Sequence, residues 1–199
     1  MVNYETFITI RNKITPFAYC FVAIFALLFV QFLYYSAQTP IAYIIGIVVT
    51  YQILRYGMKR NKKVIQRVPK SQQWGAFLLG CSIIASGIII SAFWAGINPI
   101  LNAYRYVPLP HMFYVIFLAP IGEEVIYRQM LYTDAFSNKW LGRIISGTFF
   151  VMIHAPMPMP SFVFYILATI GLFVAYEKSG NNLWVAIIVH GINNAVAFL

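Results

Sequence analysis

Two adjacent carboxylates, Glu123 and Glu124, stand within an apolar stretch of the chain, where a charged side chain at mid-helix costs about 3 kcal/mol by insertion scales. On a helix, Glu124 and Arg128 lie four residues apart on one face and can form an ion pair. Glu123 points about 100° away from that face, and an unpaired carboxylate is suited to general-base chemistry. The sequence predicts Glu123 as a catalytic base, with Glu124 and Arg128 as orienting residues. The alternative is an ion pair that only holds helices together.

Two histidines and an asparagine supply the other candidate groups. His154 follows Phe150 by four residues, and His190 precedes Asn194 by four residues. Residues four apart share a helix face, so His190 and Asn194 can both donate hydrogen bonds to one oxygen atom. We therefore predict that Glu123, His154, His190 and Asn194 are the catalytic residues. The simpler interpretations are that Phe150 is a packing residue and that Asn194 only joins two helices.

Depth along the expected helices tests whether these groups can meet. Arg128, Arg143 and Lys178 serve as markers of the inner membrane boundary. With a rise of about 1.5 Å per residue, Glu123 lies roughly 8 Å above that boundary and the two histidines lie roughly 17 and 18 Å above it. The mismatch requires tilted helices, or a fourth span whose inner end runs deeper than Arg128 indicates.

The composition shows which elements must position these groups. The 199 residues are 61% hydrophobic and 10% charged, against roughly 45–50% and 25% in soluble domains. Four uncharged runs have at least 21 residues each, and about 20 apolar residues suffice to cross a bilayer; they are residues 14–54, 71–104, 144–176 and 179–199. A soluble enzyme, a DNA-binding domain and a disordered tail are therefore excluded.

Breaks within these runs predict seven helices. Their expected bounds are residues 14–36, 40–56, 73–94, 109–132, 142–154, 161–176 and 183–199. Backbone groups in lipid must bond internally, and runs of this length are unlike the alternating strands of a barrel. The predicted fold is an all-α polytopic transmembrane helical bundle of about seven spans. Residues 1–199 form a single membrane domain, in which 109–199 are the catalytic core helices.

The net charge of +9 reflects the membrane rather than nucleic acid. Half of the fourteen basic residues fall between positions 55 and 70, between two apolar stretches, as is typical of a cytoplasmic loop on anionic headgroups. With a cytoplasmic N-terminus, only Arg105 among the basic residues lies outside. We expect a multi-pass plasma membrane protein of bacterial origin with its C-terminus outside, and no nucleic-acid partner.

The ordered motifs Glu-Glu-x-x-x-Arg at 123–128, Phe-x-x-x-His at 150–154 and His-x-x-x-Asn at 190–194 resemble those of the CAAX protease and bacteriocin-processing family. That family consists of intramembrane endopeptidases. The resemblance covers roughly residues 109–199 and implies that Glu123 and His154 activate a water molecule. It also implies that His190 and Asn194 bind the oxyanion.

We expect no cofactor. The alternative is zinc held by Glu123, His154 and His190, since the family is often labelled metalloprotease. Against zinc, the motif His-Glu-x-x-His is absent and no carboxylate obviously orients either imidazole.

The expected partners are membrane lipid and a hydrophobic or membrane-anchored peptide substrate. Bacterial members of the family are associated with bacteriocin self-immunity or leader processing. The alternative is a non-catalytic membrane protein on the same bundle, either an immunity protein or a proton-coupled permease.

Overall fold

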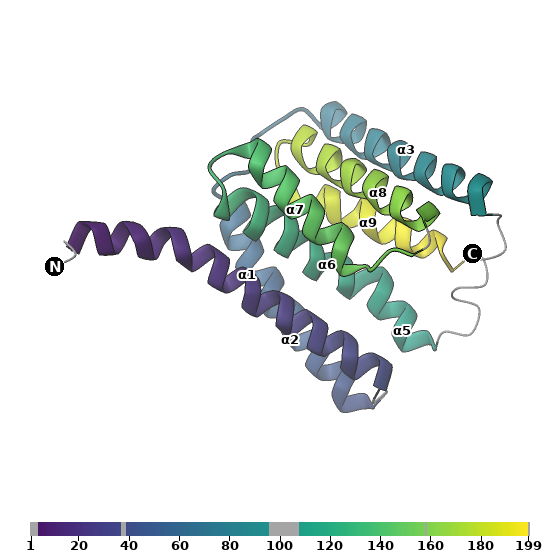
Figure 1. Cartoon of the computed structure of the whole chain (residues 1–199), viewed down its shortest axis with the longest axis horizontal. Helices are drawn as coiled ribbons and strands as arrows, with labels where there is room; N and C mark the ends of the chain where they lie inside the picture. The colour runs from purple at the N-terminus through teal and green to yellow at the C-terminus, as the bar shows by residue number, and fades with distance from the viewer. Residues whose placement is uncertain (1–3, 37–38, 96–107, 158, 199) are drawn as a thin grey trace.

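The computed structural model describes residues 4–36, 39–95, 108–157 and 159–198. Helices make up nearly all of these segments (Figure 1). In chain order they are α1 Tyr4–Ser36, α2 Pro40–Asn61, α3 Lys70–Ala95, α5 Leu109–Phe113, the π-helix η1 Tyr114–Leu118, α6 Ala119–Glu124, the π-helix η2 Val125–Ala135, α7 Lys139–Ile153, α8 Met159–Lys178 and α9 Leu183–Val196.

The predicted all-α membrane bundle is confirmed. The segments α5, η1, α6 and η2 follow one another without a break, so the described residues form seven helical rods, as the sequence predicts. Five rods are long and apolar enough to cross a membrane: Ile14–Tyr34, Pro40–Asn61, Lys70–Ala95, Leu109–Ala135 and Met159–Lys178. Helix α9 is a shorter apolar helix, and α7 has 15 residues. The protein is a multi-pass membrane protein.

Local sequence signals explain where α2 begins. Thr39 caps α2 by accepting a hydrogen bond from the amide of Ala42, and Pro40 occupies the first turn, where a proline leaves no amide unsatisfied. Helix α2 continues past its predicted end near residue 56 to Asn61. The irregular stretch predicted after α3, with Arg105, lies at residues 96–107, outside the described residues.

The helices pack in two groups around the rod that contains α6 (Figure 1). Helices α3 and α8 run side by side with α7 and α9 near them, while α1 and α2 form a pair on the other side. The contact between α3 and α8 depends on two glycines. A Cβ atom on Gly80 would lie 3.0 Å from the carbonyl oxygen of Gly171, and one on Gly171 would lie 2.8 Å from that of Gly80. Any side chain at either position would push these helices apart.

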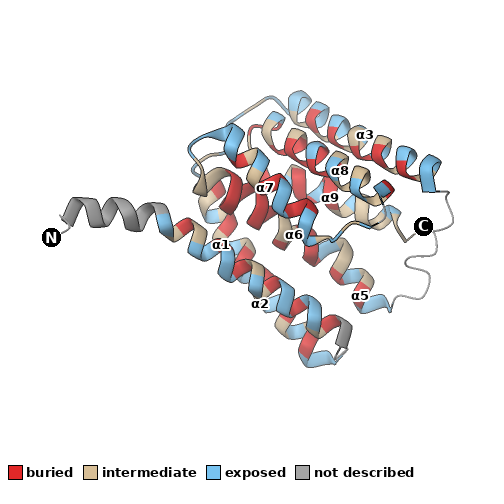
Figure 2. Ribbon diagram, viewed as in Figure 1, coloured by how far each residue is buried: buried red, intermediate tan, exposed pale blue. Residues whose placement is uncertain are grey.

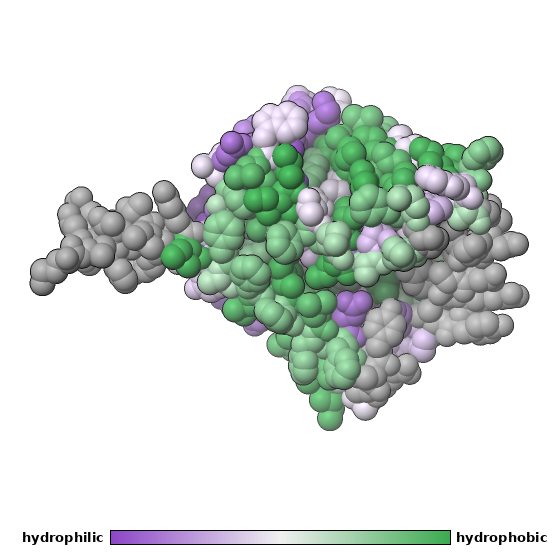
Figure 3. All heavy atoms as spheres, in the orientation of Figure 1, coloured by the Kyte–Doolittle hydropathy of each residue, from purple (hydrophilic) through white to green (hydrophobic). Residues whose placement is uncertain are grey.

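Many residues along α1, α2 and α3 are exposed at the surface of the bundle (Figure 2). Large apolar side chains such as Val22, Phe25 and Phe93 are exposed, at 67%, 70% and 94%, as suits contact with lipid tails. Figure 3 shows hydrophobic atoms over most of the described part of one face, with hydrophilic atoms gathered where α3 and α7 begin. That end therefore lies at a polar boundary of the bilayer.

The core centres on η2, and this corrects one prediction. Every residue from position 125 to 132 is buried, including Arg128, whose side chain is completely enclosed. The rod continues to Ala135, so treating Arg128 as a marker of the membrane boundary was wrong. Glu123 consequently lies deeper than its distance from Arg128 indicates, which removes most of the mismatch with the two histidines.

Candidate active site

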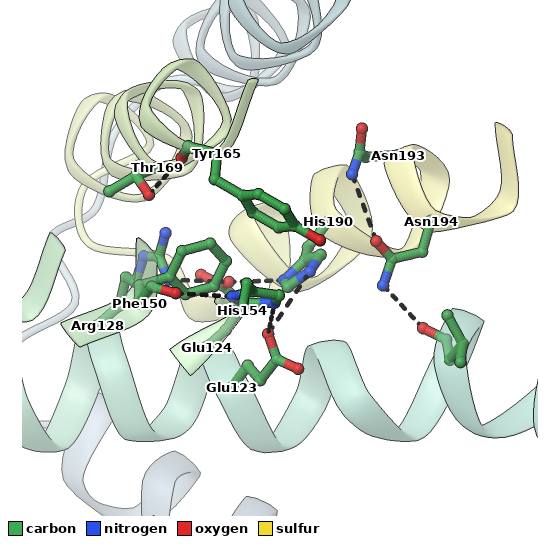
Figure 4. Close-up of polar contacts among 11 residues, drawn as sticks. Glu123, Glu124, Arg128, Phe150, His154, Tyr165, Thr169, His190, Asn193 and Asn194 are labelled. Carbon is green, nitrogen blue, oxygen red and sulfur yellow. Dashed lines mark hydrogen bonds and ion pairs between the residues drawn. The ribbon is translucent and has the colours of Figure 1, made fainter. Parts of the chain in front are cut away.

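The structure brings Glu123, His154 and His190 together from three different rods (Figure 4). One carboxylate oxygen of Glu123, Oε2, lies 3.7 Å from Nε2 of His154 and 3.8 Å from Nε2 of His190. All three residues line a cavity of about 720 Å³ bounded by α3, α8, α9 and the rod that contains α6. The predicted residues on these helices thus share one hollow.

Glu124 holds the second histidine in place. Its Oε1 atom lies 2.8 Å from Nδ1 of His190 and 3.1 Å from Nη1 of Arg128, and the side chains of Glu124 and Arg128 are both 0% exposed. The expected pairing of Glu124 with Arg128 is therefore present. The expectation that no carboxylate orients an imidazole was wrong for His190, because a contact between positions 66 residues apart leaves no trace in local spacing.

Arg128 is enclosed by aromatic rings as well as by Glu124. Its guanidinium carbon lies 4.7 Å from the ring centroid of Phe150 and 5.0 Å from that of Phe173, which are favourable cation–π distances. The Phe150 ring also contacts the imidazoles of His154 and His190, with centroids 4.7 and 5.8 Å apart. Phe150 is a packing residue, as expected, and it separates the buried cation from the cavity.

His154 owes its orientation to the end of α7. Helix α7 stops at Ile153 ahead of Pro156, and the amide of His154 bonds to the carbonyl of Val151 instead of that of Phe150. The carbonyl of Phe150, left without an amide donor as is usual at a helix C-terminus, accepts a hydrogen bond from Nδ1 of His154 at 2.6 Å. This turn directs Nε2 of His154 toward Glu123.

Tyr165 of α8 is a site residue that no sequence motif indicated. Its ring stacks on the imidazole of His154 with centroids 4.4 Å apart, and it lines the cavity. A tyrosine within an apolar span is the one local signal, and it does not distinguish a site residue from a packing residue.

Asn194 bonds to the rod that contains α6 rather than to Glu123 or either histidine. In η1 the amide of Ala119 bonds to the carbonyl of Tyr114, five residues back. In the same register the carbonyl of Val115 would need an amide at Pro120, which has none. Asn194 Nδ2 donates to this carbonyl at 2.8 Å. Asn194 therefore joins α9 to η1, and it also lines the cavity.

Replacing Asn194 by alanine should destabilise the protein by about 0.5–1.5 kcal/mol, because a partly buried carbonyl loses its donor. Adding Pro120→Ala should recover part of this loss by restoring a backbone amide. Unfolding in detergent of the two single variants and the double variant measures this coupling. Asn193→Ala, which removes a contact of Asn193 with Asn194 at 3.3 Å, is the control; equal losses at both asparagines would contradict the assignment.

Both imidazoles present the same kind of nitrogen to Glu123. A carbonyl and an ionised carboxylate can only accept hydrogen bonds, so Nδ1 of each histidine donates, and Nε2 of each neutral ring is an acceptor. The same Nδ1 contacts orient histidines that ligate metals. In the described segments, no three His, Cys, Asp or Glu side chains form a group that could hold a metal ion as they are arranged here.

Comparison with known proteins supports the motif-based resemblance. Residues 105–196 match the family model described as Type II CAAX prenyl endopeptidase Rce1-like. The chain is also similar to UPF0177 protein YbdI of Lactococcus lactis subsp. lactis (strain IL1403), with 31% identity over 87 residues. That alignment covers 43% of this chain and 45% of the relative, so it spans less than half the relative's length. No solved structure matches the chain. The three motifs therefore lie, in their order, within the part of the chain that is similar to the Rce1-like CAAX prenyl endopeptidase family.

Proposed function

We propose that the protein is an intramembrane endopeptidase that hydrolyses a peptide bond of a membrane-associated peptide or protein. The observation that carries this proposal is the carboxylate of Glu123 facing Nε2 of both His154 and His190 in one cavity of a membrane bundle. Two acceptor nitrogens, each beyond direct hydrogen-bond distance of the carboxylate oxygen, form with it a site suited to a water molecule.

In the proposed reaction, Glu123 and His154 together polarise this water. As the water oxygen attacks the carbonyl carbon of the peptide bond, Glu123 accepts the released proton. The tetrahedral intermediate then collapses, the carbon–nitrogen bond breaks, and the proton passes to the leaving nitrogen. No covalent bond to the protein is formed at any step.

His190 and Asn194 are the proposed donors to the oxyanion. Nε2 of His190 can donate when the ring is protonated, while its Nδ1 remains in contact with Glu124. Asn194 uses one amide hydrogen for the carbonyl of Val115 and keeps a second for the cavity. Donors that are held in place before the reaction stabilise charge that develops during it.

The proposal includes metal-free catalysis, because Glu123 can take the proton without a Lewis acid. For the substrate, the description of the family model points to a prenylated CAAX peptide. A role in bacteriocin self-immunity or leader processing is a narrower form of the same proposal. It would use the same hydrolytic groups on a hydrophobic peptide.

We also propose that the N-terminus lies in the cytoplasm and the C-terminus outside, in the plasma membrane. In support, the end of α2 and the segment leading into α3 carry a cluster of exposed basic side chains, as expected next to anionic headgroups. These are Arg55, Lys59, Lys62, Lys63, Arg67 and Lys70.

The test is cleavage of fluorescence-quenched peptides by purified protein in liposomes. One peptide ends in a prenylated CAAX sequence, and the other is an unmodified hydrophobic transmembrane peptide. We expect wild type to cleave at least one, and His154→Ala to slow cleavage by about 100-fold or more. A chelator should leave the wild-type rate unchanged if no metal takes part.

Three outcomes would contradict parts of this proposal. Loss of activity with chelator and recovery with zinc would contradict metal-free catalysis. Equal rates for wild type and His154→Ala would contradict the role of His154. Absence of cleavage of both peptides would favour a non-catalytic immunity protein or a proton-coupled permease, in which an intramembrane acid such as Glu123 carries protons.

A further inference from the structure

A second cavity adjoins the proposed reactive groups and shares part of its lining with the large one. It has a volume of about 240 Å³ and lies between α1, the rod that contains α6, and the end of α7. Four residues line both cavities, namely Gln31, Glu123, His154 and Tyr165. Glu123 and His154 therefore lie where the two cavities meet. We call the four shared residues the waist.

Gln31 is the member of this group that has no assigned role. It lies in the apolar span Ile14–Tyr34, it is exposed, and it is the residue of α1 that reaches the larger cavity. Its amide makes no hydrogen bond with the part of the chain that the structure describes. A polar side chain in a membrane span without a partner costs free energy, so a ligand that satisfies it would explain its position.

A peptide crossing the waist would supply such a ligand. The wall of the larger cavity is largely apolar, with Phe164 and Leu172, and the smaller cavity adds apolar side chains such as Ile24 and Leu28 to its polar ones. The carbonyl and amide groups of an extended peptide need partners in such surroundings. A glutamine side chain carries both a donor and an acceptor, and so matches one peptide unit.

We propose that the smaller cavity is a second substrate subsite, so that chain segments on the two sides of the cleaved bond occupy different cavities. Gln31 is the positioning residue that hydrogen-bonds the peptide backbone at the waist. This inference rests on the proposed peptidase function and specifies its substrate as a chain extending beyond the cleaved bond in both directions.

The first test compares Gln31→Leu with Gln52→Leu, using the quenched peptides described above. Gln52 is an exposed glutamine of α2 that lines neither cavity. Gln31→Leu should raise KM about tenfold and change kcat less than twofold, while Gln52→Leu should match wild type in both. Equal KM values for the two variants would overturn the role of Gln31, and thermal unfolding in detergent confirms that both are folded.

The second test fills the smaller cavity. Leu28 lines the smaller cavity but not the larger one, and it is 40% exposed. Leu79 of α3 lines neither cavity and is 42% exposed. Leu28→Trp should slow cleavage of a full-length peptide at least tenfold. A peptide shortened on the side that occupies the smaller cavity should be cleaved by this variant at the wild-type rate. Leu79→Trp should match wild type on both peptides.

Identical behaviour of Leu28→Trp and Leu79→Trp on both peptides would overturn the second subsite. Failure of the peptidase function itself is seen separately, as absence of cleavage of both quenched peptides by the wild-type protein. The two failures are therefore distinguishable in one set of measurements.

Discussion

Glu123→Gln should lower the rate of peptide cleavage by about 10²–10⁴-fold, the range that a general base contributes. The substitution keeps the shape of the side chain and removes its ability to accept a proton. The contacts of Glu124 with Arg128 and His190 do not involve Glu123, so the site around it should persist. Single-turnover cleavage in liposomes, which separates chemistry from peptide release, is the appropriate measurement.

Glu177→Gln is the matched control for this variant. Glu177 pairs with Arg143 at 2.7 Å, has 26% of its side chain exposed, and lines neither cavity. Its replacement should leave cleavage within about twofold of wild type, because surface ion pairs contribute little free energy. Full activity of Glu123→Gln would contradict general-base catalysis and would leave the carboxylate with a binding or structural role.

Arg128→Met should lower the free energy of unfolding by about 3–5 kcal/mol, as expected when one partner of a buried ion pair is removed. Methionine fills much of the space between Phe150 and Phe173 but leaves the fully buried carboxylate of Glu124 without its cation. Cleavage should fall as well, because Glu124 also holds Nδ1 of His190. Chemical unfolding in detergent micelles measures the first effect.

Arg143→Met provides the comparison for Arg128→Met. Arg143 pairs with Glu177, and their side chains are 34% and 26% exposed, so its loss should be about 0–1 kcal/mol. The double variant Glu124→Gln with Arg128→Met should be more stable than Arg128→Met alone, since no buried charge is then left unpaired. A loss at Arg128 no larger than the loss at Arg143 would contradict the assigned burial energetics.

The secondary structure could be predicted from the sequence because the signals that determine it are local. Uncharged runs interrupted by prolines, glycines and charged residues predict seven rods, and the described residues form seven. The errors fall at rod ends. The rod through η2 extends to Ala135 and α2 to Asn61, since polar residues beyond the predicted ends are satisfied inside the bundle. Asn61, for example, is buried and bonds to Gln129 at 2.9 Å.

The candidate site could be predicted from the sequence only in part. Residues at spacing four indicated the pairing of Glu124 with Arg128, which depends on one helix. The contacts that orient each group join residues far apart in sequence or arise where a helix ends. Glu124 reaches His190, and Asn194 reaches the carbonyl of Val115. Tyr165 and Gln31 belong to no motif, since neutral polar residues do not interrupt an uncharged run.

From its composition and periodicity alone, this sequence determined a membrane bundle of about seven helices and the identity of the polar residues that such a bundle has to accommodate. Those properties depend on each helix separately, through its length, its apolar content and the residues at its ends. Only the tertiary structure decided how deep Glu123 lies, which nitrogen of each imidazole faces it, and that two cavities meet beside it. Those features depend on the relative tilt and offset of packed helices and on the π-helical register before Pro120, and both are set by contacts between distant segments.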